Sequence, residues 1–344
     1  MNSFRALPHC NTLWKRGQEL LGVTYPIICG AMTWVSDPNL VAAVCNAGAF
    51  ASLACGNMPP EELERQIEQT RKLTDKPFAV NLITIAPNYA LHLEVALASR
   101  LPVIIFAGSV PRDQEIDNAK KYGAKVLAFA STEALAKRII RSGVDGLVLE
   151  GMEAGGHIGP IAGSVLWQQI LFHFHDEVPI FLAGGIASGK MIAHMLLMGA
   201  SGVQLGTRFV MTDECNVHPH FKKAFQRARA RDAIATPQFD SRLPVTPVRA
   251  LKNKGSIEFR KLQLELLHQL DNGEIDREKA QLEVERFWVG ALKKAAVDGD
   301  TERGSLMAGQ AVGSAHEIKP VQELIDELVH DAEHALEHVK KLLA

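Results

Sequence analysis

One ten-residue stretch gathers several groups that could do chemistry. Residues 150–159 read Glu-Gly-Met-Glu-Ala-Gly-Gly-His-Ile-Gly, with one imidazole, two carboxylates and four glycines. Histidine is the side chain best suited to move a proton near neutral pH, and glycines allow a backbone to approach a ligand closely and to move. We therefore take His157 as the candidate catalytic residue and Gly156 as a candidate cofactor contact. The alternative is an incidental histidine in a surface loop.

Two further segments bring glycines to the ends of short apolar runs. They are residues 183–185 (Ala-Gly-Gly) and 205–207 (Leu-Gly-Thr). Glycines there expose backbone N–H groups, and the helix expected after the first segment adds the positive end of its dipole. Tight turns between strands and helices would also use glycine. The pairing of the two segments nevertheless predicts a phosphate site, formed by Gly184, Gly185, Gly206 and Thr207.

Small residues after another apolar run could receive a flat ring. Cys29 is followed by Gly30, Ala31 and Met32, and small side chains let a ring lie against the backbone. Asn81, in a third run, could hydrogen-bond a polar ring edge. Each of these residues alone has a purely structural explanation. We expect them to line the same ligand-binding mouth as the phosphate site.

The elements that must position these residues alternate along the first two-thirds of the chain. Short apolar runs without polar alternation are typical of parallel strands buried on both faces, and helical patterns lie between them. The count of eight and the lack of a Gly-x-Gly-x-x-Gly turn after the first run favour a closed (β/α)₈ TIM barrel over an open doubly wound sheet. The predicted strands are Tyr25–Met32, Phe50–Gly56, Phe78–Thr84, Val103–Ser109, Lys125–Ser131, Gly146–Gly151, Pro179–Gly185 and Gly202–Phe209, and the clearest helices are Pro60–Thr74, Arg112–Tyr122, Thr132–Ser142 and Ser188–Met198.

The last third of the chain has a different character. We expect the eighth barrel helix at His218–Arg231, an irregular stretch at Pro237–Pro247, and a helical cap inserted after strand eight at Lys254–Ala296. The apolar residues of Lys319–Ala344 recur at helical spacing, which predicts an amphipathic helix that packs on the barrel or on a second subunit. The predicted parts are a cofactor-binding barrel (1–233), a helical cap or substrate region (234–300) and a C-terminal segment (301–344).

Composition narrows the class of protein. The 344 residues carry a net charge of −2, which favours neither nucleic acid nor an anionic membrane as partner. No apolar stretch reaches the roughly 20 residues that span a bilayer, and residues 1–17 do not have the pattern of a signal peptide. Five cysteines without a Cys-x-x-Cys pair indicate free thiols in a cytoplasmic protein. The spacing of His330, His334 and His338 could hold a metal, but a solvated helix face explains it better and no metal site is predicted.

Six segments together resemble the flavin-dependent nitronate monooxygenase family, also called 2-nitropropane dioxygenases, and most closely its enoyl-acyl-carrier-protein reductase II branch. The resemblance implies FMN, with its phosphate at the two glycine segments, Glu150 beside the cofactor and His157 facing the reacting edge of the flavin. Where the family often has Gln-Gly-Gly-Met, this chain has Cys-Gly-Ala-Met at residues 29–32. The matching segments are Glu150–Gly159, Ala183–Gly185, Gly206–Phe209, Asn216–Pro219, Val248–Asn253 and Gly304–Gln310.

The resemblance implies more than one reaction. The main hypothesis is reduction of an enoyl thioester, carried by acyl carrier protein or another group, with NADH or NADPH as reductant. The alternatives are oxidation of alkyl nitronates with O₂ and reduction of quinones or free flavin by NAD(P)H. From a different class, a flavin-free phosphosugar isomerase or synthase would also use a barrel with a phosphate site, and a non-catalytic flavin-binding protein is a further alternative. A homodimer is compatible with each of these.

Overall fold

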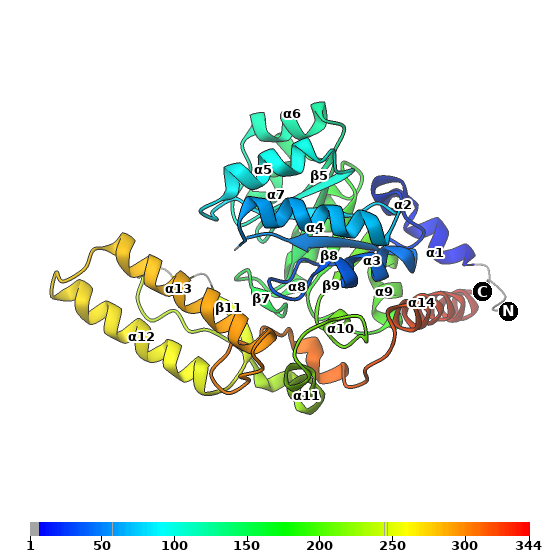
Figure 1. Cartoon of the computed structure of the whole chain (residues 1–344). Helices are drawn as coiled ribbons and strands as arrows, with labels where there is room; N and C mark the ends of the chain where they lie inside the picture. Colours follow the sequence, from blue (N-terminus) through cyan, green and yellow to red (C-terminus); the bar gives the residue numbers. More distant parts are fainter. Residues whose placement is uncertain (1–6, 57, 244, 246) are drawn as a thin grey trace.

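Eight parallel strands close into a barrel in the computed structural model, which describes residues 7–56, 58–243, 245 and 247–344. The strands follow one another around the barrel in chain order, and the last, β9, pairs with β1 through Cys29 and Leu205. All eight predicted strands and the closed (β/α)₈ architecture are therefore confirmed. Figure 1 shows helices packed around the strands. The strands are β1 (Ile27–Cys29), β2 (Phe50–Ala54), β3 (Ala79–Ile83), β4 (Val103–Ala107), β5 (Lys125–Ala130), β6 (Gly146–Glu150), β8 (Ile180–Ala183) and β9 (Gly202–Leu205).

The inside of the barrel is a packed core. Alternate strand residues such as Ile28, Phe50 and Phe181 are fully buried there, and Leu21 of the N-terminal helix α2 (Lys15–Leu21) joins the same cluster. Because their neighbours along each strand are buried against the surrounding helices, both faces of the sheet are apolar. This is why the strands have no polar alternation in the sequence.

Helices of the ring connect consecutive strands. The four clearest predicted helices are confirmed, and three helices of the ring begin at a side-chain cap: Asp37, Thr132 and Ser188 each accept a hydrogen bond from the backbone N–H three residues ahead. The ring helices are α3 (Pro38–Asn46), α4 (Pro60–Leu73), α5 (Tyr89–Ala98), α6 (Asp113–Lys121), α7 (Glu133–Arg141), α8 (Gly163–Phe174) and α9 (Gly189–Leu197), and α1 (Pro8–Leu13) precedes α2.

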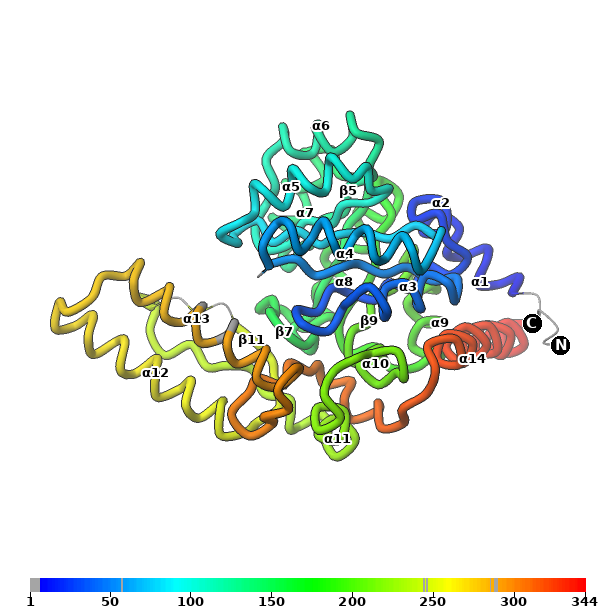
Figure 2. The backbone as a smooth tube through the Cα atoms, viewed as in Figure 1, coloured from blue at the N-terminus to red at the C-terminus, as the bar shows by residue number. Residues whose placement is uncertain are grey.

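The chain leaves the barrel after β9 to form the cap. Two short helices, α10 (Thr207–Val210) and α11 (Pro219–Arg227), come first. Strands β10 (Ala233–Ala235) and β11 (Val248–Leu251) then lead to a long helical hairpin of α12 (Lys254–Asp271) and α13 (Arg277–Ala296). The hairpin extends away from the barrel as an arm, yellow and orange in Figures 1 and 2. It has its own core, in which Phe259, Leu266 and Val284 are buried.

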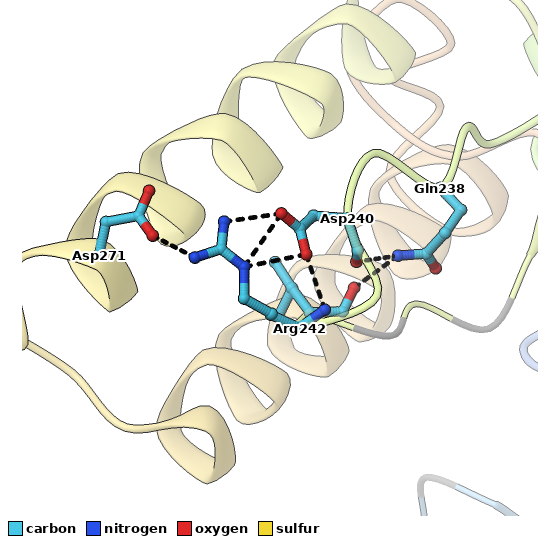
Figure 3. A network of polar contacts seen from close by, with 5 residues as sticks. Gln238, Asp240, Arg242 and Asp271 are labelled. Atoms are coloured by element: carbon cyan, nitrogen blue, oxygen red, sulfur yellow. Dashed lines mark hydrogen bonds and ion pairs between the residues drawn. The ribbon is translucent and has the colours of Figure 1, made fainter.

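An ion-pair network fastens the loop between β10 and β11 to this arm. The Arg242 guanidinium binds Asp240 of the same loop at 2.7 Å and also Asp271 at the end of α12 (Figure 3). The arginine lowers the pKa of Asp240 to about 2. The side-chain amide of Gln238 donates to the Leu243 carbonyl, so the described part of the predicted irregular stretch is held by side chains; residues 244 and 246 lie outside the described residues.

The eighth place in the helix ring is filled by the end of the chain. Helix α14 (Val321–Leu343) packs on both α9 and α3, the helices that follow the seventh and first barrel strands. A Cβ atom on Gly189 of α9 would lie 2.1 Å from the Leu328 carbonyl, so the two helix backbones touch. The expectation that residues 218–231 form the eighth ring helix is wrong. Helix α11 buries only two aromatic side chains, whereas α14 buries apolar residues from Val321 to Leu336.

The same helix receives the N-terminus. The buried carboxylate of Glu333 accepts hydrogen bonds from the backbone N–H of Cys10 at 2.8 Å and from the His9 ring at 2.6 Å. Helix α1 is thereby joined to α14. None of the helices in the described part of the chain combines the length and the apolarity that crossing a bilayer requires. The cytoplasmic location stays a prediction.

The packing of α14 predicts a large and position-dependent effect of truncating its side chains. Leu328 is fully buried against α9, whereas Leu342 on the same helix is 71% exposed. Leu328→Ala should lower the free energy of unfolding by about 2–5 kcal/mol, because it leaves a cavity. Leu342→Ala, the matched control, should change it by less than about 0.5 kcal/mol. Urea unfolding measures both; equal effects would contradict the packing of α14 as a ring helix.

Candidate active site

One cavity of about 410 Å³ opens at the carboxyl ends of the barrel strands. It takes residues from each predicted part of the chain, including Leu292 of α13 and Met307 of the C-terminal segment. The structure brings together every site residue that the sequence predicted. These are Gly30, Ala31, Met32, Asn81, Glu150, Gly156, His157, Gly184, Gly185, Gly206 and Thr207.

The glycines after β8 and β9 form a backbone surface that side chains would fill. Gly184 and Gly185 have φ of +101° and +69°, in the left-handed region that favours glycine. A Cβ atom on Gly185 would lie 3.0 Å from Cγ of Glu153. Among the described residues, no acceptor receives the backbone N–H of Gly185 or Gly206. Two such donors beside a cavity fit an anionic group such as a phosphate.

A second wall of the cavity is small and partly polar. The amide side chain of Asn81 is 8% exposed at the end of β3, and Gly30 and Ala31 follow β1. A Cβ atom on Gly30 would lie 3.0 Å from the side chain of Gln204, which also lines the cavity. Gln204 was not among the residues expected at the site, although a polar residue in the otherwise apolar strand β9 is a signal for it. These groups suit a flat ring with hydrogen-bonding edges.

The loop that carries His157 is not free to move as the glycines suggested. Gly156 and His157 form a short strand, β7, that pairs antiparallel with β11 in a three-stranded sheet outside the barrel. The backbone N–H of Ile158 also donates to the Pro247 carbonyl at 2.9 Å. The exposed His157 ring is therefore held at the cavity by the cap.

Two charged residues that the sequence analysis did not single out as site residues hold this loop. The Arg249 guanidinium, on β11, donates to the Met152 carbonyl at 2.9 and 3.1 Å and to the Ala233 carbonyl at 2.6 Å. The Glu153 carboxylate accepts from the backbone N–H of Gly163 at 2.9 Å. Burial lowers the pKa of Arg249, and the nearby negative charge of Glu153 opposes that shift. In the sequence, the only signal for Arg249 was that residues 248–253 resemble the corresponding segment of the family.

The C-terminal segment closes the site from the other side. The Thr207 hydroxyl accepts a hydrogen bond from the backbone N–H of Gly309 at 3.2 Å. A Cβ atom on Gly155 would lie 2.4 Å from that same nitrogen, so the two backbones pass in direct contact. The backbone N–H of Gln310 donates to the Glu153 carbonyl at 3.0 Å. The glycines at 155 and 309 are thus needed for close approach between two distant parts of the chain.

The comparisons agree with this architecture. The nitronate monooxygenase family model matches residues 15–90 and 83–331. The chain belongs to the nitronate monooxygenase family. A (3aS,4S,5R,7aS)-5-hydroxy-7a-methyl-1-oxo-octahydro-1H-indene-4-carboxyl-CoA dehydrogenase from Mycobacterium tuberculosis is 30% identical over 339 residues, covering 91% of this chain and 94% of the relative.

Two solved structures are also similar to this chain. FabK from Thermotoga maritima has 34% identity and a TM-score of 0.84, covering 95% of this chain and 98% of that one. A nitroalkane oxidase from Streptomyces ansochromogenes has 26% identity and a TM-score of 0.78, covering 94% and 99%. The protein is therefore a flavin-dependent oxidoreductase on a (β/α)₈ barrel, and the flavin-free phosphosugar alternative loses its support.

Glu150 lines the cavity, and the pKa of its carboxyl group is strongly shifted. Burial raises its pKa from an ordinary value of 4.5 to about 8. No cationic side chain among the described residues forms an ion pair with it. A raised pKa favours the protonated form of the carboxyl group, which can donate a hydrogen bond into the cavity.

The histidines of the C-terminal helix lie elsewhere. His330, His334 and His338 are exposed on α14, away from the cavity lining. Within the described ranges, no group of three or more His, Cys, Asp or Glu side chains is arranged to hold a metal ion.

The pKa of Glu150 predicts how the stability of the flavin-free protein depends on pH. Between pH 4.5 and about 8 the folded state binds more protons than the unfolded state, so the free energy of unfolding should fall as the pH rises. Glu150→Gln cannot ionise and should flatten that slope. Glu337→Gln, at an exposed position on α14, is the control and should keep it. Urea unfolding across this pH range tests the prediction, which fails if Glu150→Gln retains the wild-type slope.

Proposed function

We propose that the flavin is FMN and that its phosphate binds at Gly184, Gly185, Gly206 and Thr207. The N–H groups of Gly185 and Gly206, which have no acceptor in the described part of the chain, and the left-handed turn at 184–185 support this assignment. The ring would lie against Gly30–Met32, with Asn81 and Glu150 as polar neighbours and Gly156 at the His157 side. A neutral Glu150 can donate a hydrogen bond to the ring.

We propose that the enzyme reduces an enoyl thioester, with NADH or NADPH as the reductant. The observation that carries the proposal is the likeness to FabK over 95% of this chain, and a relative named for a coenzyme A thioester supports the class of substrate. Bound FMN would supply the hydride transfer between the nicotinamide and the substrate. Acyl carrier protein or coenzyme A would carry the acyl group, and a homodimer remains part of the proposal.

His157 has the central role among the protein groups. Its exposed ring lines the cavity and its backbone is fixed by pairing with Val248. We propose that it orients the thioester and donates a proton to the α-carbon as the β-carbon becomes reduced. The antiparallel sheet keeps the ring in place, so little reorganisation is needed when substrate binds.

A second candidate function is oxidation of alkyl nitronates with O₂. The likeness to a nitroalkane oxidase over 94% of the chain favours it. In that reaction His157 would act as a base or stabilise the anionic substrate. Reduction of quinones or free flavin by NAD(P)H is the remaining alternative in the same class.

The phosphate assignment predicts that a carboxylate at position 185 releases the cofactor. Gly185→Asp should place a negative charge against the phosphate, and the purified protein should lose its yellow colour on dialysis. Gly143→Asp is the matched control, because Gly143 has a similar φ of +82° but lies at the end of α7 with nothing within 4 Å of its Cβ position. Absorbance of the dialysed proteins measures the retained flavin. If Gly185→Asp stays as yellow as Gly143→Asp, the assignment is wrong.

Anaerobic half-reactions test the role of His157 and the choice of reaction together. Mixing wild-type enzyme with NADH or NADPH should bleach the flavin absorbance, and adding an enoyl thioester should restore it. His157→Ala should keep the cofactor and slow the restoring step by about 10²–10⁴-fold, the usual contribution of a general acid. His157→Asn should recover much of the rate if the ring only orients substrate, and little if it moves a proton.

His173→Ala, at an exposed position on α8, is the control for these measurements. No bleaching by either nicotinamide, with turnover of a nitronate in air, would replace the reductase by the second candidate. If His157→Ala has wild-type rates on both types of substrate, His157 has no role in catalysis and is an incidental residue of the loop.

A further inference from the structure

Trp34 lies beside the cavity in an unusual backbone conformation. Its φ is +65°, and in the described chain only Arg100 is another non-glycine residue at positive φ. A bulky side chain in this region costs conformational free energy, and such positions cluster where a protein binds ligands. The indole is also 42% exposed, although large aromatic side chains usually bury most of their surface. The backbone strain at Trp34 therefore accompanies an aromatic side chain that is held toward solvent.

The loop around Trp34 is braced on both sides. The Met32 carbonyl accepts from the N–H groups of Val35 and Ser36 at 2.9 and 2.8 Å. The Ser36 hydroxyl donates to the Gly30 carbonyl at 3.2 Å and accepts from the Met32 N–H at 2.9 Å. Asp37 then caps α3 and also binds the side chain of Asn216. These contacts fix the loop, so the ring is presented by a rigid support.

A cation from the cap faces this ring. The Lys293 ammonium of α13 lies 5.7 Å from the centroid of the Trp34 ring. Thr33 and Val35 on one side, and Leu292 and Ala296 on the other, line the cavity. The pair therefore stands at the rim of the cavity, where the barrel and the cap meet, with an aromatic face and a positive charge together.

We propose that Trp34 and Lys293 bind the adenosine phosphate half of a nucleotide-bearing ligand, NAD(P)H or a coenzyme A thioester. This inference rests on the proposed function, because both ligands follow from it. A cavity of about 410 Å³ is of the size that holds a single drug-sized ligand, and it must also take the flavin. The nucleotide part of a second large ligand must then lie outside, at the rim. An indole stacks on a purine, and a lysine ammonium binds a phosphate as a point charge.

A competing explanation is that the pair only latches the cap to the barrel. Trp34→Gly separates the two, because glycine adopts a φ of +65° without strain while the ring is removed. If Trp34 serves the nucleotide, this variant should keep its flavin and its melting temperature. Lys293→Met keeps most of the aliphatic stem and removes only the charge. Phe172→Ala and Lys341→Met, at exposed positions on α8 and α14, are the matched controls.

Calorimetric titration of the flavin-loaded, full-length protein tests the proposal without any turnover. The probes are ADP, adenosine 2′,5′-bisphosphate and adenosine 3′,5′-bisphosphate. Loss of one aromatic–base stack should raise Kd about 5- to 150-fold in Trp34→Gly. Lys293→Met should weaken binding of the same probe, and the two controls should not.

The three probes also distinguish the source of the nucleotide. Preference for the 3′,5′-bisphosphate assigns the rim to coenzyme A, and preference for ADP or the 2′,5′-bisphosphate assigns it to NADH or NADPH. The proposal is overturned if no probe binds to the wild type, or if Kd is equal in wild type and Trp34→Gly. In either case the pair would serve only to join the cap to the barrel. Nucleotide binding without enoyl thioester reduction would instead overturn the reaction alone.

Discussion

A buried guanidinium holds the site together, because Arg249 donates to backbone carbonyls from two distant stretches of chain. Met152 belongs to the loop after β6, and Ala233 begins β10 of the cap. Removing this group would leave the Ala233 carbonyl without its buried donor, which costs more than an ordinary hydrogen bond is worth. The short sheet of β7, β10 and β11, and with it the placement of His157, depends on this contact.

The site consequently has two halves of different origin. The barrel supplies rigid backbone for a cofactor, through strand ends that the surrounding core fixes. The cap supplies strand β11, which holds the histidine by pairing with β7, and it also supplies the wall formed by α13 and the rim lysine. Changes in the α12–α13 arm can therefore alter the substrate side of the cavity without disturbing the glycines after β8 and β9. This separation explains how relatives with one fold carry names for different reactions.

The barrel and the residues that line the cavity could be predicted from the sequence for a simple physical reason. Parallel strands end on one side of a barrel, so residues after eight recognisable apolar runs must converge. Contacts set by distant partners could not be predicted in this way. Nothing local shows that α14 rather than α11 completes the ring, since both are amphipathic, or that Arg249 pins a glycine-rich loop. The conformation of Trp34 could not be predicted either, because a left-handed backbone conformation is expected at glycine or asparagine.

The place of α14 sets the order in which this barrel can be made. A ribosome synthesises the N-terminus first, and domains generally begin to fold during synthesis. Here the helix that lies between the first and seventh ring helices follows all the other ring helices along the chain, and it also anchors the first helix through Glu333. A nascent chain can assemble its strands but must expose the apolar sides of α9 and α3 until α14 has been synthesised. The growing polypeptide therefore has an open seam between α9 and α3 while the other barrel elements and the cap are being made.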